Sequence, residues 1–374
     1  MKFIGIYAGH KIAAARAMRL VILIGLVWWT GCSTRALETP SVPPDPGRCS
    51  GSKNPVSLVP ASFFAQAAPQ MRKLDEFAVD GGYVYFSYHD DDAHTTNVVG
   101  GGIGRVPTNG GPIEAVLTSP TGVFFLHARN GVLTWQTENT SIQVRDLSNT
   151  PHSIHAPSGA LDMLPQYIDG AGDVYFQVPG TLAADAIPKK WDHVAQQTVE
   201  IYRGSLSVVP HLNVEPVFTD EQIFFVGHIS AIMSLPTAGG TFTTLVPDTA
   251  GMTTSLLGVD AERIYFYQDP AAGIMLPPRM PALIQAVPKT GGATTSLVRA
   301  LPSSAFVADD KYLYWVQSAD NLTAPRPVQR LAKTGDQTIQ TVAADSGGAY
   351  AIAADACNLY WLTQQAVTAL AKQP

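Results

Sequence analysis

Several residue types that mark common protein chemistries are scarce in this sequence. Only three cysteines occur in 374 residues and none are spaced as C-x-x-C, so neither a zinc finger nor a thioredoxin-like redox site is indicated. The G-x-S-x-G, H-E-x-x-H and phosphate-loop motifs are absent as well. No motif therefore supports a standard serine hydrolase, zinc protease or nucleotide-binding protein.

Charge is also scarce, and it leans acidic. Charged residues make up 14% of the chain, and the formal net charge is −6. Residues 1–31 contain four basic residues and no acid, so the remainder carries −10. Sequence-independent nucleic-acid binding and electrostatic docking to anionic lipid both need a basic surface. We expect neither for this protein.

The apolar run from Leu20 to Trp29 is too short to cross a membrane. Its ten residues would span roughly 15 Å as a helix, about half of a bilayer core. Basic residues precede the run, so residues 1–31 are typical of an export signal, and Met18 is an alternative start.

The apolar run ends in small residues followed by Cys32. This order resembles the bacterial lipobox, although Trp29 stands where that family usually has Leu. The resemblance implies a lipidated Cys32, and Ser33 is similar to the pattern of outer-membrane sorting. An ordinary secretory signal, with Cys32 incidental, is the alternative. Residues 32–53 are rich in Pro and Ser and are expected to form a semi-rigid tether to a domain at 54–374.

Residues 54–374 contain one sequence unit seven times. The unit has an apolar run that ends in Asp, a short turn, an apolar strand with paired aromatics, and a strand that ends near Pro and Gly-Gly. The steps between copies match the length of a four-stranded propeller blade. The last aromatic of each copy stands at Phe86, Trp135, Phe176, Phe225, Phe266, Trp315 and Trp361. The sequence therefore predicts an all-β, seven-bladed β-propeller.

The four strands of a blade can be assigned in the sixth copy. Strand a ends at Asp309, strand b spans 312–316, strand c spans 328–332 and strand d spans 338–342. Turns such as 106–111 and 287–292 contain Asn-Gly or Gly-Gly, which supply the positive φ of tight hairpins. Neighbouring aromatics on a strand point to opposite faces, so we expect them to pack between blades rather than to bind a ligand.

The Leu-Tyr-Trp copies at 313–315 and 359–361 resemble the YWTD type of propeller repeat. The pattern over 54–374 is similar to repeat propellers of secreted bacterial lipoproteins, especially of the myxobacterial type. The Thr-Asp that completes YWTD is absent, and that class has six blades. The resemblance therefore implies an architecture but no site.

The last copy ends in a strand c at 366–372, so the seventh blade lacks its strand d. Residues 55–59 resemble a strand d, and we expect this N-terminal segment to complete the blade. Strands b and d of that blade would lie about 10 Å apart at standard spacing, a distance that the short segment 50–54 can cover to bring Cys49 to Cys357 in the a–b turn. We expect a Cys49–Cys357 disulfide, which suits an oxidising compartment.

Two segments are candidate binding elements, and both are assigned here to b–c loops. The first, in blade one, is His89, Asp90, Asp91, Asp92 and His94, which could hold a cation through carboxylate and imidazole groups. The second, in blade three, surrounds Trp191. Exposed loops with no ligand are the alternative for both.

A third candidate is a ring of carboxylates on the d–a connections, which would bind Ca²⁺ or Mg²⁺ at the channel mouth. Its members would be Asp75, Glu76, Asp162, Glu215, Asp248 and Asp345. Scattered acids are expected in any acidic chain, so this set supports only an alternative function, a metal-dependent hydrolase or lyase. Outside that alternative we expect no cofactor.

The longest b–c loops are expected in blades one, three and five, at 87–101, 177–199 and 267–281. They share a face with the d–a connections, and long loops on a rigid scaffold often carry recognition. We therefore expect a non-enzymatic binding or scaffolding lipoprotein of the bacterial envelope. It would be held at the outer membrane by lipid and would bind a protein or glycan.

Overall fold

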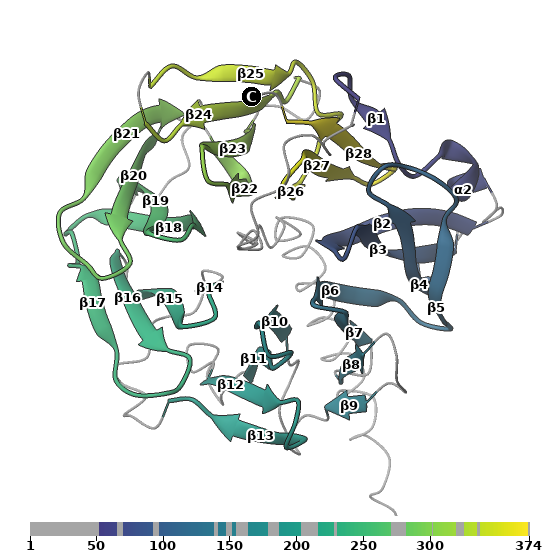
Figure 1. Ribbon diagram of the computed structural model, residues 1–374, viewed down its shortest axis with the longest axis horizontal. Coiled ribbons are helices and arrows are strands. Elements are labelled where there is room, and N and C mark those ends of the chain that lie inside the picture. Colours follow the sequence, from purple (N-terminus) through teal and green to yellow (C-terminus); the bar gives the residue numbers. More distant parts are fainter. Residues whose placement is uncertain are drawn as a thin grey trace, which may run out of the picture.

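The computed structural model of the chain describes residues 52–65, 70–92, 97–137, 141–146, 152–154, 164–178, 187–202, 216–227, 230–270, 282–300, 302–318, 325–334 and 337–372. In these ranges the strands form seven four-stranded antiparallel sheets, and Figure 1 shows the sheets arranged as blades of a ring. The predicted seven-bladed propeller is confirmed. Within these ranges, no helix is long and apolar enough to cross a membrane.

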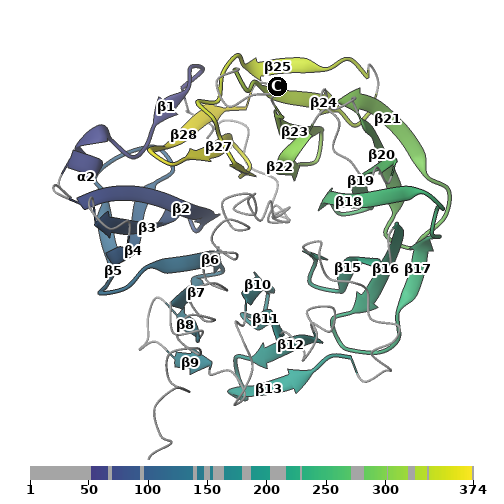
Figure 2. The same ribbon diagram turned by 180° about the vertical axis from the view of Figure 1, so that it is seen from behind.

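Each blade runs from an inner strand a, beside the central opening, to an outer strand d (Figures 1 and 2). Blade one comprises β2 (Gln70–Asp80), β3 (Tyr83–Asp92), β4 (Val98–Pro107) and β5 (Glu114–Ser119), and blade two comprises β6 (Val123–Arg129), β7 (Val132–Thr137), β8 (Ile142–Asp146) and β9 (His152–Ile154). Blade three comprises β10 (Leu164–Ile168), β11 (Val174–Val178), β12 (Ile187–Asp192) and β13 (Gln197–Glu200), and blade four comprises β14 (Val217–Phe218), β15 (Gln222–Gly227), β16 (Ala231–Pro236) and β17 (Thr243–Val246). Blade five comprises β18 (Met252–Val259), β19 (Arg263–Pro270), β20 (Ala282–Pro288) and β21 (Thr295–Ala300), and blade six comprises β22 (Pro302–Ala308), β23 (Tyr312–Gln317), β24 (Val328–Ala332) and β25 (Gln340–Ala343). Blade seven comprises β26 (Ala351–Ala354), β27 (Asn358–Thr363), β28 (Ala366–Ala371) and β1 (Val56–Ser57).

The turns and aromatic pairs lie where the repeat predicts them. Each predicted aromatic pair falls in the second strand of its blade, and β24 has the predicted bounds of strand c. In the c–d turns, Gly110 and Gly291 have φ of 86° and 84°, a region that residues with a Cβ rarely adopt. These glycines let the chain reverse in a tight hairpin, which fixes the register of strands c and d.

The aromatic pairs form the seams between blades. Tyr314 packs in a core shared with blade seven, beside Trp361, while Trp315 packs in a core shared with blade five, beside Tyr265. All four rings are at most 2% exposed. A fully buried side chain of this size contributes about 3 kcal/mol of transfer free energy. The structural role expected for these aromatics is therefore confirmed.

The N-terminal strand closes the ring as predicted. In β1, Val56 and Ser57 pair with Ala369 and Thr368 of β28, and Figure 1 shows the start of the described chain beside its end. Because β1 has only two residues, its ladder is short. The next residues, Leu58 and Val59, are 6% and 1% exposed and anchor the segment in the core.

Three of the predicted long b–c loops differ from the structure. In blade one the segment 87–101 is mostly strand, because β3 and β4 continue as a hairpin to Asp92 and Val98. In blade three, residues 187–192 are strand c itself. In blade five, β19 continues to Pro270, and 271–281 lie outside the described residues. The sequence suggested loops because Asp, Asn and Gly have low strand propensity, yet cross-strand pairing overrides that preference.

Candidate functional site

The acidic run of blade one lies on a strand, which corrects its assignment to a loop. We name the part of blade one beyond the ordinary strand length the blade-one arm, comprising residues 70–74, 88–92 and 98–102. In it, Lys73 pairs with His89 and Arg72 with Asp90 across the β2–β3 ladder. Strand b has ten residues here and six in blades two, four, six and seven. His94 lies outside the described residues.

One face of the blade-one arm carries a stacked guanidinium. Arg72 donates two hydrogen bonds to Asp90, from Nε at 2.7 Å and from Nη2 at 2.9 Å. Its guanidinium carbon lies 4.6 Å from the ring centre of Phe63, on helix α2 (Ala61–Ala65), and 4.4 Å from that of Tyr88. Such bidentate, stacked arginines are rigid, because the planar fork is held on both sides.

The opposite face carries a chain of four ionisable groups, which we name the His89 chain. Lys73 Nζ lies 2.7 Å from Asp91 Oδ2, and Asp91 Oδ1 lies 3.3 Å from His89 Nε2. His89 Nδ1 in turn lies 2.7 Å from Asp75 Oδ2. The ring of Phe124, on the inner strand of blade two, lies beside the imidazole at 6.3 Å between ring centres.

The charges of the His89 chain shift its pKa values. Burial lowers the pKa of His89, but the hydrogen bond and charge of Asp75 and the charge of Asp91 outweigh it, so the pKa is raised. Burial raises the pKa of Asp75 by more than His89 lowers it. An imidazole held between two carboxylates has no free lone pair, so the predicted cation site would first have to break these contacts.

Glycines at the base of the arm allow its close packing. A Cβ on Gly102 would lie 2.3 Å from the Leu117 carbonyl oxygen and 2.7 Å from the Tyr88 hydroxyl. A Cβ on Gly104 would lie 2.5 Å from the ring of Phe86. Aromatic side chains thus cover the glycines of the neighbouring strand, and the Gly run serves packing rather than a ligand.

Trp191 lies on a strand and not at the tip of a loop. It pairs with Val174 and Thr198 within blade three, and its half-buried ring packs against the core between blades two and three. Beside it, Lys190 Nζ lies 2.7 Å from Asp173 Oδ2. The ring therefore supports the blade, which is a second correction to the predicted binding loops.

Three carboxylates of the alternative metal site, those of Asp75, Asp248 and Asp345, form local contacts, and residues 75 and 76 lie in strand β2 rather than on a d–a connection. Asp75 belongs to the His89 chain, while the backbone nitrogen of Glu76 donates to Ser87 Oγ at 3.2 Å. Asp248 accepts from the Ser230 backbone at 3.0 Å, and Asp345 accepts from the Gly347 backbone at 2.9 Å. Asp162 and Glu215 lie outside the described residues. Within the described part of the chain, no three His, Cys, Asp or Glu side chains form a group that could hold a metal ion.

A set of hydrogen bonds and ion pairs that the sequence did not predict lies at the ends of the inner strands, on the face that carries the a–b turns. Asp260, at the end of strand a, accepts from the Tyr265 hydroxyl at 2.6 Å and from Lys333 of the next blade. Asp309 has the same kind of ion pair with Lys372, whose Nζ lies 2.7 Å away. We name these contacts the Asp–Lys latches. Their signal in the sequence is a Lys directly after strand c, at 333 and 372.

Two blades lack the Asp on which a latch would be built. In blade two, Arg129 stands in the Asp position and Thr134 in the Tyr position. Arg129 reaches Asp220 of blade four with bonds of 2.7 and 2.9 Å, while the Tyr167 hydroxyl of blade three donates to Asp220 at 2.9 Å. Three consecutive blades are thereby tied together. In blade four, Thr219 takes the Asp position, so the usual carboxylate and its charge are absent there.

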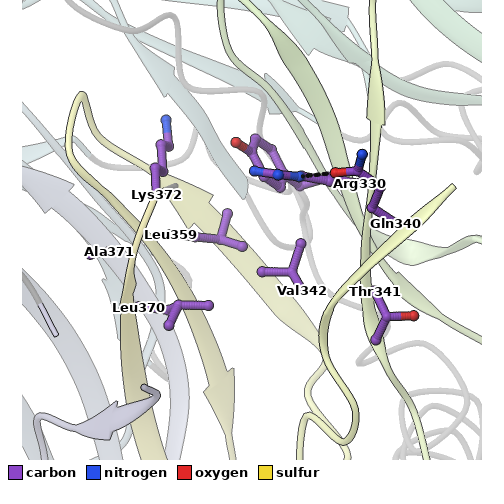
Figure 3. Close-up of a pocket in the computed structure, with 9 residues that line it drawn as sticks. Arg330, Gln340, Thr341, Val342, Leu359, Leu370, Ala371 and Lys372 are labelled. Carbon is purple, nitrogen blue, oxygen red and sulfur yellow. Dashed lines mark hydrogen bonds between the residues drawn. The ribbon is translucent and has the colours of Figure 1, made fainter. Parts of the chain in front are cut away.

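A small cavity lies between blades six and seven. Figure 3 shows Arg330 and Gln340, joined by a hydrogen bond of 2.8 Å, on one side and Leu359, Leu370 and Lys372 on the other. Its volume is about 110 Å³, whereas pockets for small organic ligands are about 300 Å³ or more. The cavity suits a few waters and not a substrate.

Comparisons with known proteins agree on the fold. No family model and no curated protein matches the sequence. Among solved structures, the virginiamycin B lyase of Staphylococcus aureus with quinupristin is similar at 12% identity and TM-score 0.55, over 84% of this chain and 98% of that one. An oligogalacturonate lyase in complex with manganese is similar at 10% identity and TM-score 0.58, over 87% and 94%.

A third similar structure differs in how its ring closes. The β-propeller domain of the Trilobed protease from Pyrococcus furiosus is similar at 10% identity and TM-score 0.55, over 78% of this chain and 91% of that one, and is described as having an open velcro topology. In the present chain β1 closes the ring. At such identities the likeness shows the fold alone, because propellers host many unrelated activities.

Proposed function

We propose that this protein is a binding or scaffolding propeller that uses the blade-one arm to contact a protein or glycan partner. The observation that carries the proposal is the arm itself, a hairpin that extends past the ordinary blade while its charges are largely neutralised internally. Asp90 and Asp91, at 8% and 5% exposed, face Arg72 and Lys73. Such an element holds its shape without a partner and pays little ordering entropy on binding.

The end of the arm also exposes apolar surface. Met71 and Val99 are 45% and 40% exposed and lie on the strands that flank the acidic run. Apolar side chains ringed by charged ones are the usual composition of a recognition surface. In the rest of the described residues, large apolar side chains exposed to this degree are Val56, beside the closure, and Val194, in a turn of blade three.

Partner capture from envelope extracts tests the proposal. We expect the double variant Met71→Asp/Val99→Asp to lose most of the captured partner, because two carboxylates would be desolvated at the contact. The matched control is Val194→Asp, which changes the more exposed residue on a different blade, at 87% exposure. Equal capture by the arm variant and the wild type would refute the role of the arm.

We further infer that the propeller is anchored by lipid on Cys32 to the bacterial envelope, at the outer membrane. The basic–apolar–small–Cys order of the first 32 residues and the Pro-rich stretch that follows support this anchoring. Mass spectrometry of protein from the membrane fraction should find diacylated Cys32 at the mature N-terminus. An unmodified Cys32 or a mature end elsewhere would contradict it.

We also propose the Cys49–Cys357 disulfide. Cys49 lies outside the described residues, but nearby contacts support the pairing. The backbone nitrogen of Ala371 donates to the Ser52 carbonyl at 3.0 Å, and that of Lys372 donates to the Cys357 carbonyl at 2.8 Å. Ser52 and Cys357 therefore flank the same end of β28, about two strand spacings or 10 Å apart. Three residues of chain can cover that distance.

A further inference from the structure

The His89 chain links the blade-one arm to its blade and to blade two. Lys73 and Asp91 belong to the arm, while Asp75 belongs to the bulge where strand a rejoins the blade. The side chain of Lys73 is 37% exposed, and those of Asp91, His89 and Asp75 are 8%, 14% and 20% exposed. The ammonium of Lys73 is thus the most exposed group of the chain, and the imidazole lies between two largely shielded carboxylates.

We propose that His89 is a pH-responsive latch: its imidazolium holds the outer end of the arm, and loss of one proton releases that end. The latch would regulate partner binding by the blade-one arm, so its biological use rests on the proposed function. The latch itself is defined by contacts within blade one.

Hydrogen-bond chemistry gives the latch two states. Only the imidazolium carries an N–H on both ring nitrogens: Nδ1 is hydrogen-bonded to Asp75 at 2.7 Å, and Nε2 forms a charge contact with Asp91 at 3.3 Å. Once neutral, the ring keeps one N–H, and the shorter contact to Asp75 retains it. The lone pair on Nε2 then faces the Asp91 carboxylate, which is repulsive. Asp91 is the penultimate residue of β3, so the outer end of the arm loses this attachment.

The groups around His89 set the direction of the switch. On β2 and β3 the facing charges are Asp75, Asp91 and Lys73, and Glu76 adjoins Asp75 in the bulge. The neighbouring positions on β4, Gly100 and Gly101, carry no charge. Blade two contributes the ring of Phe124, with His127 three residues further along that strand. Arg72 and Asp90 neutralise each other on the other face of the arm.

The sign of the pH dependence follows from these groups. Two carboxylates against one ammonium raise the pKa of His89, and burial raises that of Asp75, so the folded arm binds protons more tightly than the unfolded chain. The imidazolium stabilises the folded arm fully below about pH 6.5, the ordinary pKa of His. This stabilisation is lost as the pH rises through the raised pKa that His89 has in the folded protein. The arm is therefore held at acidic to neutral pH and released in base.

Two measurements on the mature full-length protein test the latch. NMR of the His89 Cε1–H between pH 5 and 9, assigned with the variant His89→Gln, gives its titration midpoint. Hydrogen exchange of peptides within 70–92 and 97–102, corrected for the intrinsic rate, gives the protection of the arm. We expect a midpoint above 6.5 and a fall in protection of at least tenfold across the same midpoint.

Two variants separate the latch from general loosening of the arm. His89→Gln carries no positive charge between the two carboxylates at any pH, so its arm should show the low protection at every pH. Asp90→Asn, on the other face, should leave the pH transition in place. Protection that stays constant while His89 titrates, or a midpoint below 6.5, would overturn the proposal even if the variants fail to fold.

Partner capture is read separately from exchange. A pH-dependent arm whose apolar variant Met71→Asp/Val99→Asp still captures the partner would remove the proposed function and leave the latch intact. A pH-independent arm that still carries the partner contact would do the reverse.

Discussion

Removal of the charge at one Asp–Lys latch should cost several kcal/mol. Lys372, which follows strand β28 of blade seven, is the ammonium partner of Asp309 on blade six. Their side chains are 12% and 10% exposed, so the pair is largely shielded from water. In the variant Lys372→Met the aliphatic stem is kept and the charge is lost, so Asp309 stays buried with no counter-ion.

The structure gives an approximate size for the loss of unfolding free energy in Lys372→Met. Breaking a buried ion pair by removing one partner costs about 3–5 kcal/mol. Asp309 keeps two backbone donors, Lys311 N at 2.9 Å and Tyr312 N at 2.8 Å, which places the expected loss near the lower bound. We therefore expect Lys372→Met to lower the free energy of unfolding by about 3 kcal/mol at pH 7.

The pH dependence of the loss, together with a double-mutant cycle at residues 309 and 372, shows whether the buried charge of Asp309 causes it. Burial raises the pKa of Asp309, but the charge and hydrogen bond of Lys372 outweigh it and hold the pKa below its ordinary value. This stabilisation is present above about pH 4 and is lost as the pH falls through the folded pKa. The difference between wild type and Lys372→Met should therefore shrink toward pH 3.

Urea unfolding followed by tryptophan fluorescence measures both effects. In the Asp309→Asn background, which lacks the buried charge, Lys372→Met should cost less than about 1 kcal/mol. A loss of equal size in the two backgrounds, or a difference that does not depend on pH, would refute the assignment of the effect to the buried charge.

Three further predictions follow from the packing and the closure. Gly102→Ala should lower the free energy of unfolding by about 1–3 kcal/mol, because its Cβ would overlap the Leu117 carbonyl and the Tyr88 hydroxyl, while Gly100→Ala, whose nearest contact is 3.7 Å, should cost less than about 1 kcal/mol in the same urea assay. Tyr265→Phe should cost about 1–3 kcal/mol, since Asp260 loses a hydroxyl donor at 2.6 Å, whereas Tyr267→Phe on the same strand is the control; equal losses would count against the bond. Non-reducing peptide mapping should recover a Cys49–Cys357 cross-link, and Cys357→Ser should cost about 2–5 kcal/mol; two free thiols in the oxidised protein would contradict the pairing.

The candidate site was less accessible from the sequence than the fold. The sequence indicates the run at 89–92 as a candidate, but its place on a strand and its pairing with Arg72 and Lys73 depend on the register of β2 against β3. Trp191 was also singled out, and the structure shows that it supports a core seam. The pairing of Arg129 with Asp220 could not be predicted, because the two residues are 91 positions apart and meet only when blades two to four are curved into a ring.

The sequence by itself determined the blade count, the position of strand b in every blade and the closing role of β1. These features follow from a repeat about one blade long and from turn residues whose backbone preferences act over a few positions. Tertiary structure alone decided the length of the blade-one arm, the contacts of the His89 chain and the Asp–Lys latches. Each of these depends on which side chains meet across strands and across blades, and that is fixed by the register of β2 against β3 and by the closure of the ring, neither of which a local pattern encodes.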